Sequence, residues 1–318
     1  MKLCATVFII SLVIVAGADG QTARLETLAS VPGEVDLLAA SDRVLVATHG
    51  GSLRMVDLSN SGSWEMTEIH EFAQPVLGLV VESQVGWVAN SHDGLYRLDL
   101  ADQATVALTG RFRTRGQAVG VAASGPWVVV ADNSLGFDVV DTSELDRIGE
   151  YLSDGFPRGI GAADHLVFVA DQPAGLIVLD ASSPATPTVR GTLSLGRDPI
   201  TRVIVPQGRS EDQSALAFVA VVSPAAGLQI VDLSDPSAPM IATTVPTGGS
   251  PRGVAIWRHQ VYVVSESALE LFDVSEPTRP VLLLAQAVPD DATQLSVTER
   301  YVFLATPDGI TVFRRPAR

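Results

Sequence analysis

Cysteine is almost absent from this sequence. The single cysteine, Cys4, stands at the front of an N-terminal apolar stretch that runs from Leu3 to Ala16. A lipid-bearing cysteine would follow such a stretch, so Cys4 does not fit that role. If the stretch is removed, the rest of the chain has no thiol, no disulfide and no cysteine-based metal site. A domain of this size can bury enough apolar surface to fold without disulfides.

The first residues have the pattern of a secretory signal peptide. Lys2 supplies a positive start, the apolar stretch follows, and Ala16-Gly17-Ala18 fits a cleavage site with small residues. The pattern predicts a signal peptide over residues 1–18 and a mature chain over 19–318, with cleavage after Gly20 as an alternative. No second apolar stretch reaches the length of a membrane-spanning helix. We therefore expect a secreted, periplasmic or extracellular protein without a membrane span in its mature chain.

Positive charge is scarce. The chain has 21 Lys and Arg against 36 Asp and Glu, a formal net charge of −15. A nucleic-acid-binding protein needs a basic surface against the phosphates, and an anionic lipid surface also attracts basic residues. The composition therefore argues against both partners and favours a soluble acidic protein.

Sequence motifs for catalysis and metal binding are also missing. The chain has no Gly-x-Ser-x-Gly, no glycine-rich phosphate loop and no His-Glu-x-x-His. His49 and His92 are expected in equivalent turns, but neither belongs to a paired His-x-His spacing. The sequence thus predicts no catalytic residue, no metal and no cofactor.

A short phrase that returns along the whole chain is the strongest signal. It consists of a small residue, an apolar residue, three mostly apolar positions and an aspartate. The aspartates are Asp57, Asp99, Asp141, Asp180, Asp232 and Asp273, and in a seventh copy Arg314 stands in their place. The successive spacings are 42, 42, 39, 52, 41 and 41 residues, counted from 57 to 314. A period near this length, filled with short strands, is typical of a β-propeller.

One repeat can be divided into four strands. In the fourth copy, Arg158–Ala163 is a short inner strand, Leu166–Ala170 is an apolar second strand, Leu176–Asp180 is the third and Val189–Leu195 is a polar outer strand. We therefore predict an all-β fold, a single seven-bladed β-propeller with four antiparallel strands per blade. The last copy lacks an outer strand and Ala23–Val31 has no blade of its own, so this N-terminal strand is expected to close the ring. The aspartate of the phrase is expected to accept hydrogen bonds from the loop that follows it.

The phrase resembles the LVIVD repeat, which is found in a family of bacterial and archaeal propellers. Leu228-Gln229-Ile230-Val231-Asp232 and Leu176-Ile177-Val178-Leu179-Asp180 carry the resemblance most plainly, and it extends over about residues 33–313. The resemblance implies a propeller of exported or cell-surface character and implies little chemistry.

Candidate binding residues gather where a propeller binds ligands most often. The loops between outer and inner strands and the turns between second and third strands share one face around the channel mouth. These loops and turns would collect Arg115, Arg158, Arg202, Arg252, His49 and His92. Arg158, Arg202 and Arg252 are expected at equivalent positions, where they could clamp an anionic group. Alternatively, each arginine could pair with an acid of a neighbouring blade, such as Asp132 or Asp171, and lock the blades together.

Two functions remain open at this point. The first is a scaffold that binds a protein or carbohydrate partner at the propeller face without catalysis. The second is a propeller enzyme, such as a polysaccharide lyase, hydrolase or isomerase, with its site at the channel mouth. An enzyme would need an acid or base and a charge stabiliser within reach of the same small volume, whereas a scaffold needs only a broad exposed face.

Overall fold

The computed structural model contains only strands, turns and loops in the part of the chain that it describes. That part comprises residues 24–59, 64–82, 84–102, 106–133, 135–172, 174–195, 202–204, 218–223, 227–289 and 291–316. The expected signal peptide, residues 1–18, lies outside it. None of the described residues forms a helix that is long and apolar enough to cross a membrane.

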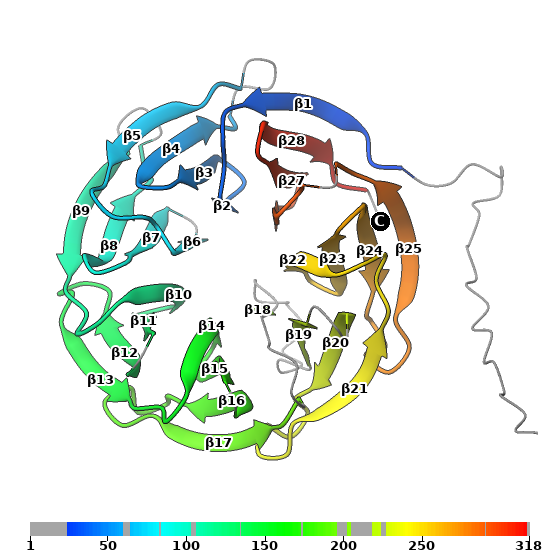
Figure 1. Cartoon of the computed structure of the whole chain (residues 1–318). Helices are drawn as coiled ribbons and strands as arrows, with labels where there is room; N and C mark the ends of the chain where they lie inside the picture. The colour runs from blue at the N-terminus through cyan, green and yellow to red at the C-terminus, as the bar shows by residue number, and fades with distance from the viewer. Residues whose placement is uncertain are drawn as a thin grey trace, which may run out of the picture.

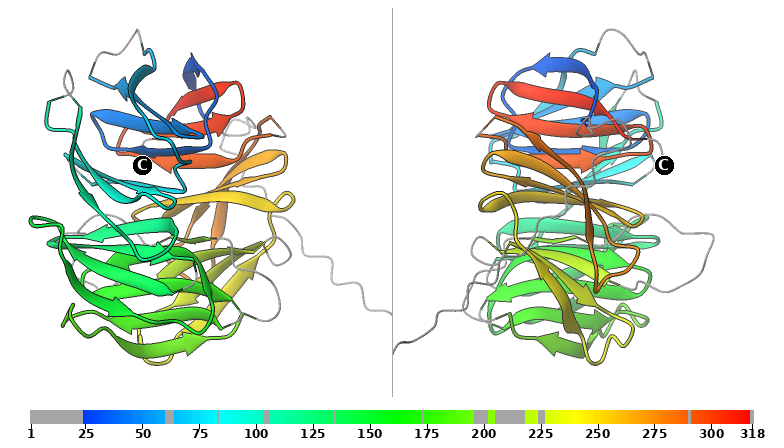
Figure 2. Two further views of the ribbon diagram at one scale, coloured as in Figure 1. Left: turned by 60° about the vertical axis from the view of Figure 1, so that its left-hand side comes forward. Right: turned by 90° about the vertical axis from the view of Figure 1, so that its right-hand side faces the viewer.

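The strands form seven four-stranded antiparallel sheets that are arranged as a ring around a central axis (Figure 1). Six sheets consist of four consecutive strands each, and we call them blades 1 to 6. Blade 7 is composite, because β26, β27 and β28 are joined there by β1 from the other end of the chain. Figure 2 shows the blades from the side, stacked face against face around the ring.

The bounds of the strands follow the repeat. Blades 1 and 2 comprise β2 (Leu37–Ala40), β3 (Val44–His49), β4 (Ser52–Asp57), β5 (Thr67–Glu71), β6 (Gly78–Glu82), β7 (Val85–Asn90), β8 (Gly94–Asp99) and β9 (Ala107–Phe112). Blades 3 and 4 comprise β10 (Ala118–Ser124), β11 (Trp127–Asp132), β12 (Gly136–Asp141), β13 (Arg147–Tyr151), β14 (Phe156–Ala163), β15 (Leu166–Gln172), β16 (Gly175–Asp180) and β17 (Thr188–Leu193). Blades 5 and 6 comprise β18 (Arg202–Ile204), β19 (Phe218–Ser223), β20 (Gly227–Asp232), β21 (Met240–Val245), β22 (Pro251–Trp257), β23 (Gln260–Ser265), β24 (Ala268–Asp273) and β25 (Val281–Ala287). Blade 7 comprises β26 (Gln294–Val297), β27 (Tyr301–Thr306), β28 (Gly309–Arg314) and β1 (Thr27–Pro32).

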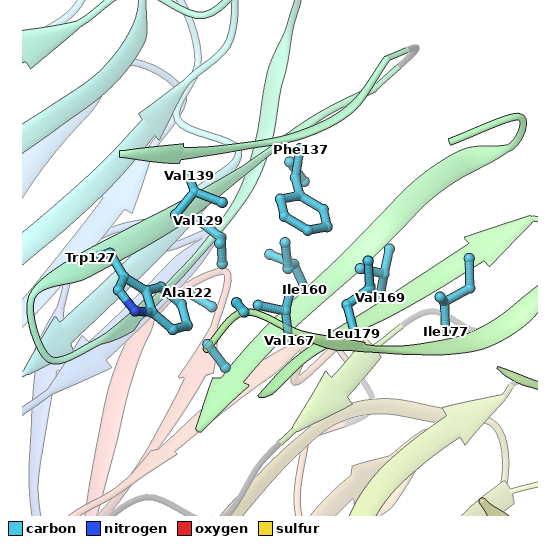
Figure 3. Close-up of a cluster of buried hydrophobic side chains, with 13 residues drawn as sticks. Ala122, Trp127, Val129, Phe137, Val139, Ile160, Val167, Val169, Ile177 and Leu179 are labelled. Carbon is cyan, nitrogen blue, oxygen red and sulfur yellow. The ribbon is translucent and has the colours of Figure 1, made fainter. Parts of the chain in front are cut away.

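The hydrophobic core lies between the blades. In Figure 3, side chains of blade 3, including Trp127 and Phe137, face side chains of blade 4, including Ile160 and Val167. The second strands are almost wholly apolar, and the third strands mostly so, because both of their faces are covered in this way. A strand buried on one face only would alternate apolar and polar residues instead.

The aspartate that ends the repeat phrase fixes the loop that leads from the third strand to the outer strand. In six blades its Oδ1 accepts a hydrogen bond of 2.8–2.9 Å from the backbone N–H two residues further on. This confirms the structural role that the sequence predicts for the aspartate. Blade 7 needs no such loop, because its outer strand comes from elsewhere. There, Arg314 instead pairs with Glu26 beside β1, with Nε and Oε2 2.7 Å apart.

The closing strand occupies a different range from the one expected. It was expected over Ala23–Val31, but β1 covers Thr27–Pro32, and Val31 pairs with Ile310 of β28. Residues just before β1 serve a second purpose, since Leu25 is buried and its N–H donates to Gln286 Oε1 of blade 6 at 2.8 Å. The N-terminal segment therefore joins blade 7 to blade 6 as well as completing blade 7.

All seven outer strands carry a shift in their register with the third strand. In six of them, β1 included, the shift falls between the fourth and fifth positions of the phrase, and in blade 1 it falls two positions earlier. A bulge of this kind twists an edge strand and hinders pairing with another chain. The shared position shows that β1 is the outer strand of a repeat that has been divided between the two ends of the chain.

Deleting residues 24–32 tests the closure directly. We expect the melting temperature to fall by 10 °C or more, because the deletion bares β28 and uncovers the apolar faces of blades 6 and 7. As a control, Glu26→Ala removes only an exposed ion pair and should cost about 0–1 kcal/mol. Calorimetry of both variants checks this, and a truncated protein that melts with the full chain would disprove the closure.

Candidate functional site

One face of the ring, which we call the mouth face, carries two kinds of connection. These are the linkers from an outer strand to the next inner strand and the turns between second and third strands. The two sets of residues expected at the channel mouth all belong to these linkers and turns or to the adjoining strand ends. The contacts of their side chains, however, differ from the ligand contacts and the blade-locking ion pairs that the sequence suggested.

Arg115 lies in the linker before β10, and its guanidinium is held by acids of blade 3. Its two terminal nitrogens lie 3.1 Å from Asp138 Oδ1 and 2.8 Å from Glu150 Oε2. Asp138 is buried on β12 and also contacts Arg147 Nε of β13 at 2.9 Å. Arg115 therefore anchors the linker, and its partners are Asp138 and Glu150 rather than Asp132 or Asp171.

The other three arginines are not equivalent to one another. Arg158 and Arg252 each occupy the bulged position of an inner strand. Arg202 pairs with Val222, which is the register position that Gly159 and Gly253 hold in their blades. The prediction that the three arginines occupy equivalent positions is therefore wrong for Arg202, which lies one position further along its strand. Arg252 is half-buried and engaged with a partner, and the side chains of Arg158 and Arg202 lie outside the described part of the structure.

The two histidines lie in equivalent turns, as expected, but in different surroundings. His49 faces two carboxylates of the linker before β2, with Nε2 3.1 Å from Glu34 Oε2 and Nδ1 3.4 Å from Asp36 Oδ1. His92 is exposed in the turn between β7 and β8. Within the described ranges, no group of three or more His, Cys, Asp and Glu side chains is placed to hold a metal ion.

A polar residue lies at the mouth end of the second strand in every blade, and four of these residues contact the incoming linker. The polar residues are His49, Asn90, Asp132, Asp171, Ser223, Ser265 and Thr306. Asn90 Nδ2 donates to the backbone oxygen of Gln74 at 2.7 Å, and Asp132 Oδ2 accepts from the N–H of Gly116 at 2.5 Å. Asp171 Oδ2 accepts from the hydroxyl of Ser153, also at 2.5 Å. Asp132 and Asp171, which the sequence offered as partners for the mouth arginines, therefore bind the linkers.

Some side chains at the third position of the phrase also contact these linkers. Each of these contacts the linker that leads into its own blade. Asp138 is one example, and Glu270 of blade 6 is another, because its Oε2 accepts from the N–H of Gly248 at 3.0 Å. Burial raises the pKa of Glu270, and the hydrogen bonds from Gly248 and Ser265 oppose that shift. A carboxyl group with a raised pKa in the folded state stabilises the fold most at low pH and less as the pH rises through that pKa.

A pocket opens on the mouth face near the axis, between blades 2 and 3. It has a volume of about 290 Å³, and its described lining residues are Leu77, Gln117, Val119 and Asn133. The two amide side chains are linked, because Asn133 Nδ2 donates to Gln117 Oε1 at 3.3 Å and Gln117 Nε2 donates to Ser91 Oγ at 3.1 Å. None of the six candidate site residues is among these lining residues.

Two large apolar side chains are exposed in the next linker of the mouth face, which joins blade 3 to blade 4. Leu152 follows β13 and is 60% exposed, and Phe156 begins β14 and is 54% exposed. The linker between them rests on the turn that carries Asn133, since the N–H of Ser153 donates to the oxygen of Leu135 at 3.4 Å. We group the pocket lining and these two apolar side chains of the adjoining linker under one name, the mouth patch: Leu77, Gln117, Val119, Asn133, Leu152 and Phe156.

None of the six mouth-patch residues was expected at a binding site from the sequence. Gln117 and Asn133 adjoin repeat positions, but amides are common in turns and carry no signal of their own. Leu152 and Phe156 could have indicated a surface site, because they are apolar residues that flank Ser153-Asp154-Gly155 in a linker where polar residues are usual.

Ring, blades and strand order together define the protein as a β-propeller. More particularly, it contains LVIVD repeats, since the family model described as "LVIVD repeat" matches residues 115–152, 159–194 and 216–247. These three stretches lie within the region of resemblance inferred from the sequence. No curated protein matches the chain.

Solved structures share the fold at low sequence identity. One is the WD40 β-propeller domain of Doa1, with a TM-score of 0.72 and 10% identity over 94% of this chain and 98% of that one. Another is the computationally designed Ika8 protein, with a TM-score of 0.66 and 10% identity over 92% of this chain and 99% of that one. At this identity the likeness shows the propeller fold alone.

The role of Arg115 as an anchor is tested by removing its buried partner. Asp138→Ala leaves two arginines without their shared carboxylate, and we expect a loss of about 1.5–3 kcal/mol in the free energy of unfolding, since both arginines stay about one third exposed. Glu150→Ala is the matched control, since Glu150 also binds Arg115 but is 42% exposed, and it should cost about 0–1 kcal/mol. Urea unfolding of both variants measures the difference, and equal small losses would return Arg115 to the list of ligand-binding candidates.

Proposed function

We propose that the protein is a binding scaffold without catalytic activity that engages a protein partner through the mouth patch. The exposure of Leu152 and Phe156 on the same face as the pocket is the observation that supports this most directly. Large apolar side chains that cluster on a surface next to polar groups are characteristic of protein-binding sites. The propeller supplies a rigid base for such a surface, because the linkers that form it are fixed by buried side chains.

The alternative of a propeller enzyme has less support on this face. The pocket's described lining consists of two amides and two aliphatic side chains, and none of these four can act as an acid or base near neutral pH. The arginine nearest to them in sequence, Arg115, already shares its charge with Asp138 and Glu150. A carbohydrate partner would favour an aromatic platform, and none of those four residues is aromatic.

We further propose that the protein acts outside the cytoplasm, on the strength of the N-terminal pattern Leu3–Ala18 alone. Cleavage after Ala18 should give a mature protein that begins at Asp19. N-terminal sequencing of protein recovered from the exported fraction checks this. Recovery of the intact chain from Met1 would contradict the proposal.

A selection from a displayed library of random peptides tests the binding function. We expect peptides chosen on the wild-type protein to bind the double variant Leu152→Ser, Phe156→Ser at least tenfold more weakly. The reason is that burying each of these side chains contributes about 1.5–3 kcal/mol. Titration calorimetry measures the affinities, and the melting temperature verifies that the variant is folded.

The chain offers a matched control on the outer strands. Met240 is 60% exposed, as Leu152 is, and Val281 is 48% exposed, but both lie on the outside of the ring. Met240→Ser, Val281→Ser should leave peptide binding unchanged. If no peptide is selected, or if both double variants weaken binding equally, the mouth patch is not the binding surface.

A further inference from the structure

The two amides of the mouth patch are held in a defined orientation. Gln117 Nε2 donates to Ser91 Oγ, and Gln117 Oε1 accepts from Asn133 Nδ2, so each amide fixes the other. The backbones are joined as well, because the N–H of Asn133 donates to the oxygen of Gln117 at 3.0 Å. A binding group that is already ordered loses little conformational entropy when a ligand arrives.

Ser91 completes this arrangement at a conformational cost. It is almost fully buried, its φ is 41°, and its backbone oxygen accepts from the N–H of Ala118 at 2.9 Å. A positive φ is uncommon for a residue other than glycine, and such strained positions concentrate at functional sites. Here the strained residue is the one that positions Gln117.

The amide pair retains unused hydrogen-bonding capacity toward the pocket. Each side-chain NH₂ group has two protons, and one proton of each is used. Among the described residues, neither the second protons nor Asn133 Oδ1 have a further partner. The site therefore offers donors and an acceptor side by side, without net charge.

We infer that the Gln117–Asn133 pair binds the main chain of an extended peptide segment of the partner, with one apolar side chain of that segment against Leu77 and Val119. This rests on the proposed function and specifies the partner's chemistry. A peptide group presents one N–H and one C=O, which is the complement of a side-chain amide. The pocket volume of about 290 Å³ is at the lower limit for a ligand site, so it suits a single side chain better than a large cofactor.

The neighbouring surface gives the segment a direction. The linker that carries Leu152 and Phe156 leads from blade 3 to blade 4, and its Ser153 contacts the turn that holds Asn133. A segment whose main chain is bound at the amide pair would therefore place a second apolar side chain on Leu152 and Phe156. Main-chain hydrogen bonds supply affinity in this mode, and the apolar contacts supply specificity.

The test is a cycle between the protein and a peptide taken from the selection described above. Each backbone nitrogen of the peptide is methylated in turn, which removes one N–H donor. We expect one or two positions to weaken binding to the wild-type protein by about three- to tenfold. On Asn133→Ala the same methylation should have no further effect, because its acceptor is already gone.

Two further variants keep the result interpretable. Gln84→Ala removes an exposed amide from the hairpin between β6 and β7 on the opposite face, and it should preserve the full effect of methylation. Asn133→Leu, which keeps the size of the side chain but has no acceptor, serves in place of Asn133→Ala if the latter melts at a lower temperature than the wild type. It should abolish the methylation effect in the same way.

The outcomes separate this inference from the proposed function. Suppose that binding depends on Leu152 and Phe156, but methylation weakens binding to Asn133→Ala as much as binding to the wild type. The main-chain site is then wrong, and the proposed scaffold function stands. If no peptide binds the mouth patch, both fail. If an oligosaccharide from a defined panel displaces the peptide and its binding is lost in Asn133→Ala, the site is a carbohydrate site and the inference is overturned.

Discussion

Closure of the ring is the constraint on which the rest of the structure depends. Each blade buries apolar side chains on both faces, so each needs a neighbour on both sides, and only a closed ring meets this requirement for every blade. The pairing of β1 with β28 provides it. Leu25 and Phe313 lie together in the cluster between blades 6 and 7, and Val31 and Val312 lie in the cluster between blades 7 and 1. Removing the closing strand therefore affects two blade interfaces at once.

The mouth face is rigid for a related reason. Buried polar side chains reach its linkers from two sides, from the end of the second strand and from the third position of the phrase. Asp132 and Asp138 illustrate this in blade 3, where one binds the N–H of Gly116 and the other binds Arg115 of the same linker. A linker that moved away would leave these buried polar groups without hydrogen-bond partners, which costs free energy. The contacts therefore favour one linker conformation. The surface residues between them, such as Gln117, are consequently presented in fixed positions.

Much of the fold could be read from the sequence, because the repeat states it several times. The phrase with its aspartate located the third strands, and apolar runs such as Leu166–Ala170 located the second strands. The bounds of the closing strand were less certain, since residues 24–26 resemble a strand in composition but serve as a connection to blade 6. The offset of Arg202 could not be predicted either, because the register of β18 against β19 is defined only by the assembled blade.

The candidate site was harder to predict than the fold. Arginine and aspartate attract attention as chemical groups, yet a buried acid such as Asp138 accounts for the position of Arg115. Whether a charged side chain is paired or available to a ligand depends on its neighbours from other strands. These neighbours are known only once the blades are assembled. Gln117 and Asn133 show the converse, since each is unremarkable alone and their value comes from being brought together with Ser91.

The division of blade 7 also governs the order of folding. Residues in each of the first six blades can find their partners locally, but Glu26 and Arg314 are 288 positions apart in the sequence. The entropy lost in closing a loop grows slowly with its length, by about 0.6 kcal/mol per doubling, so the separation delays closure far more than it weakens it. During synthesis β1 emerges first and has no partner until β28 exists. The strand that seals the ring therefore has no native partner while every other blade is being made.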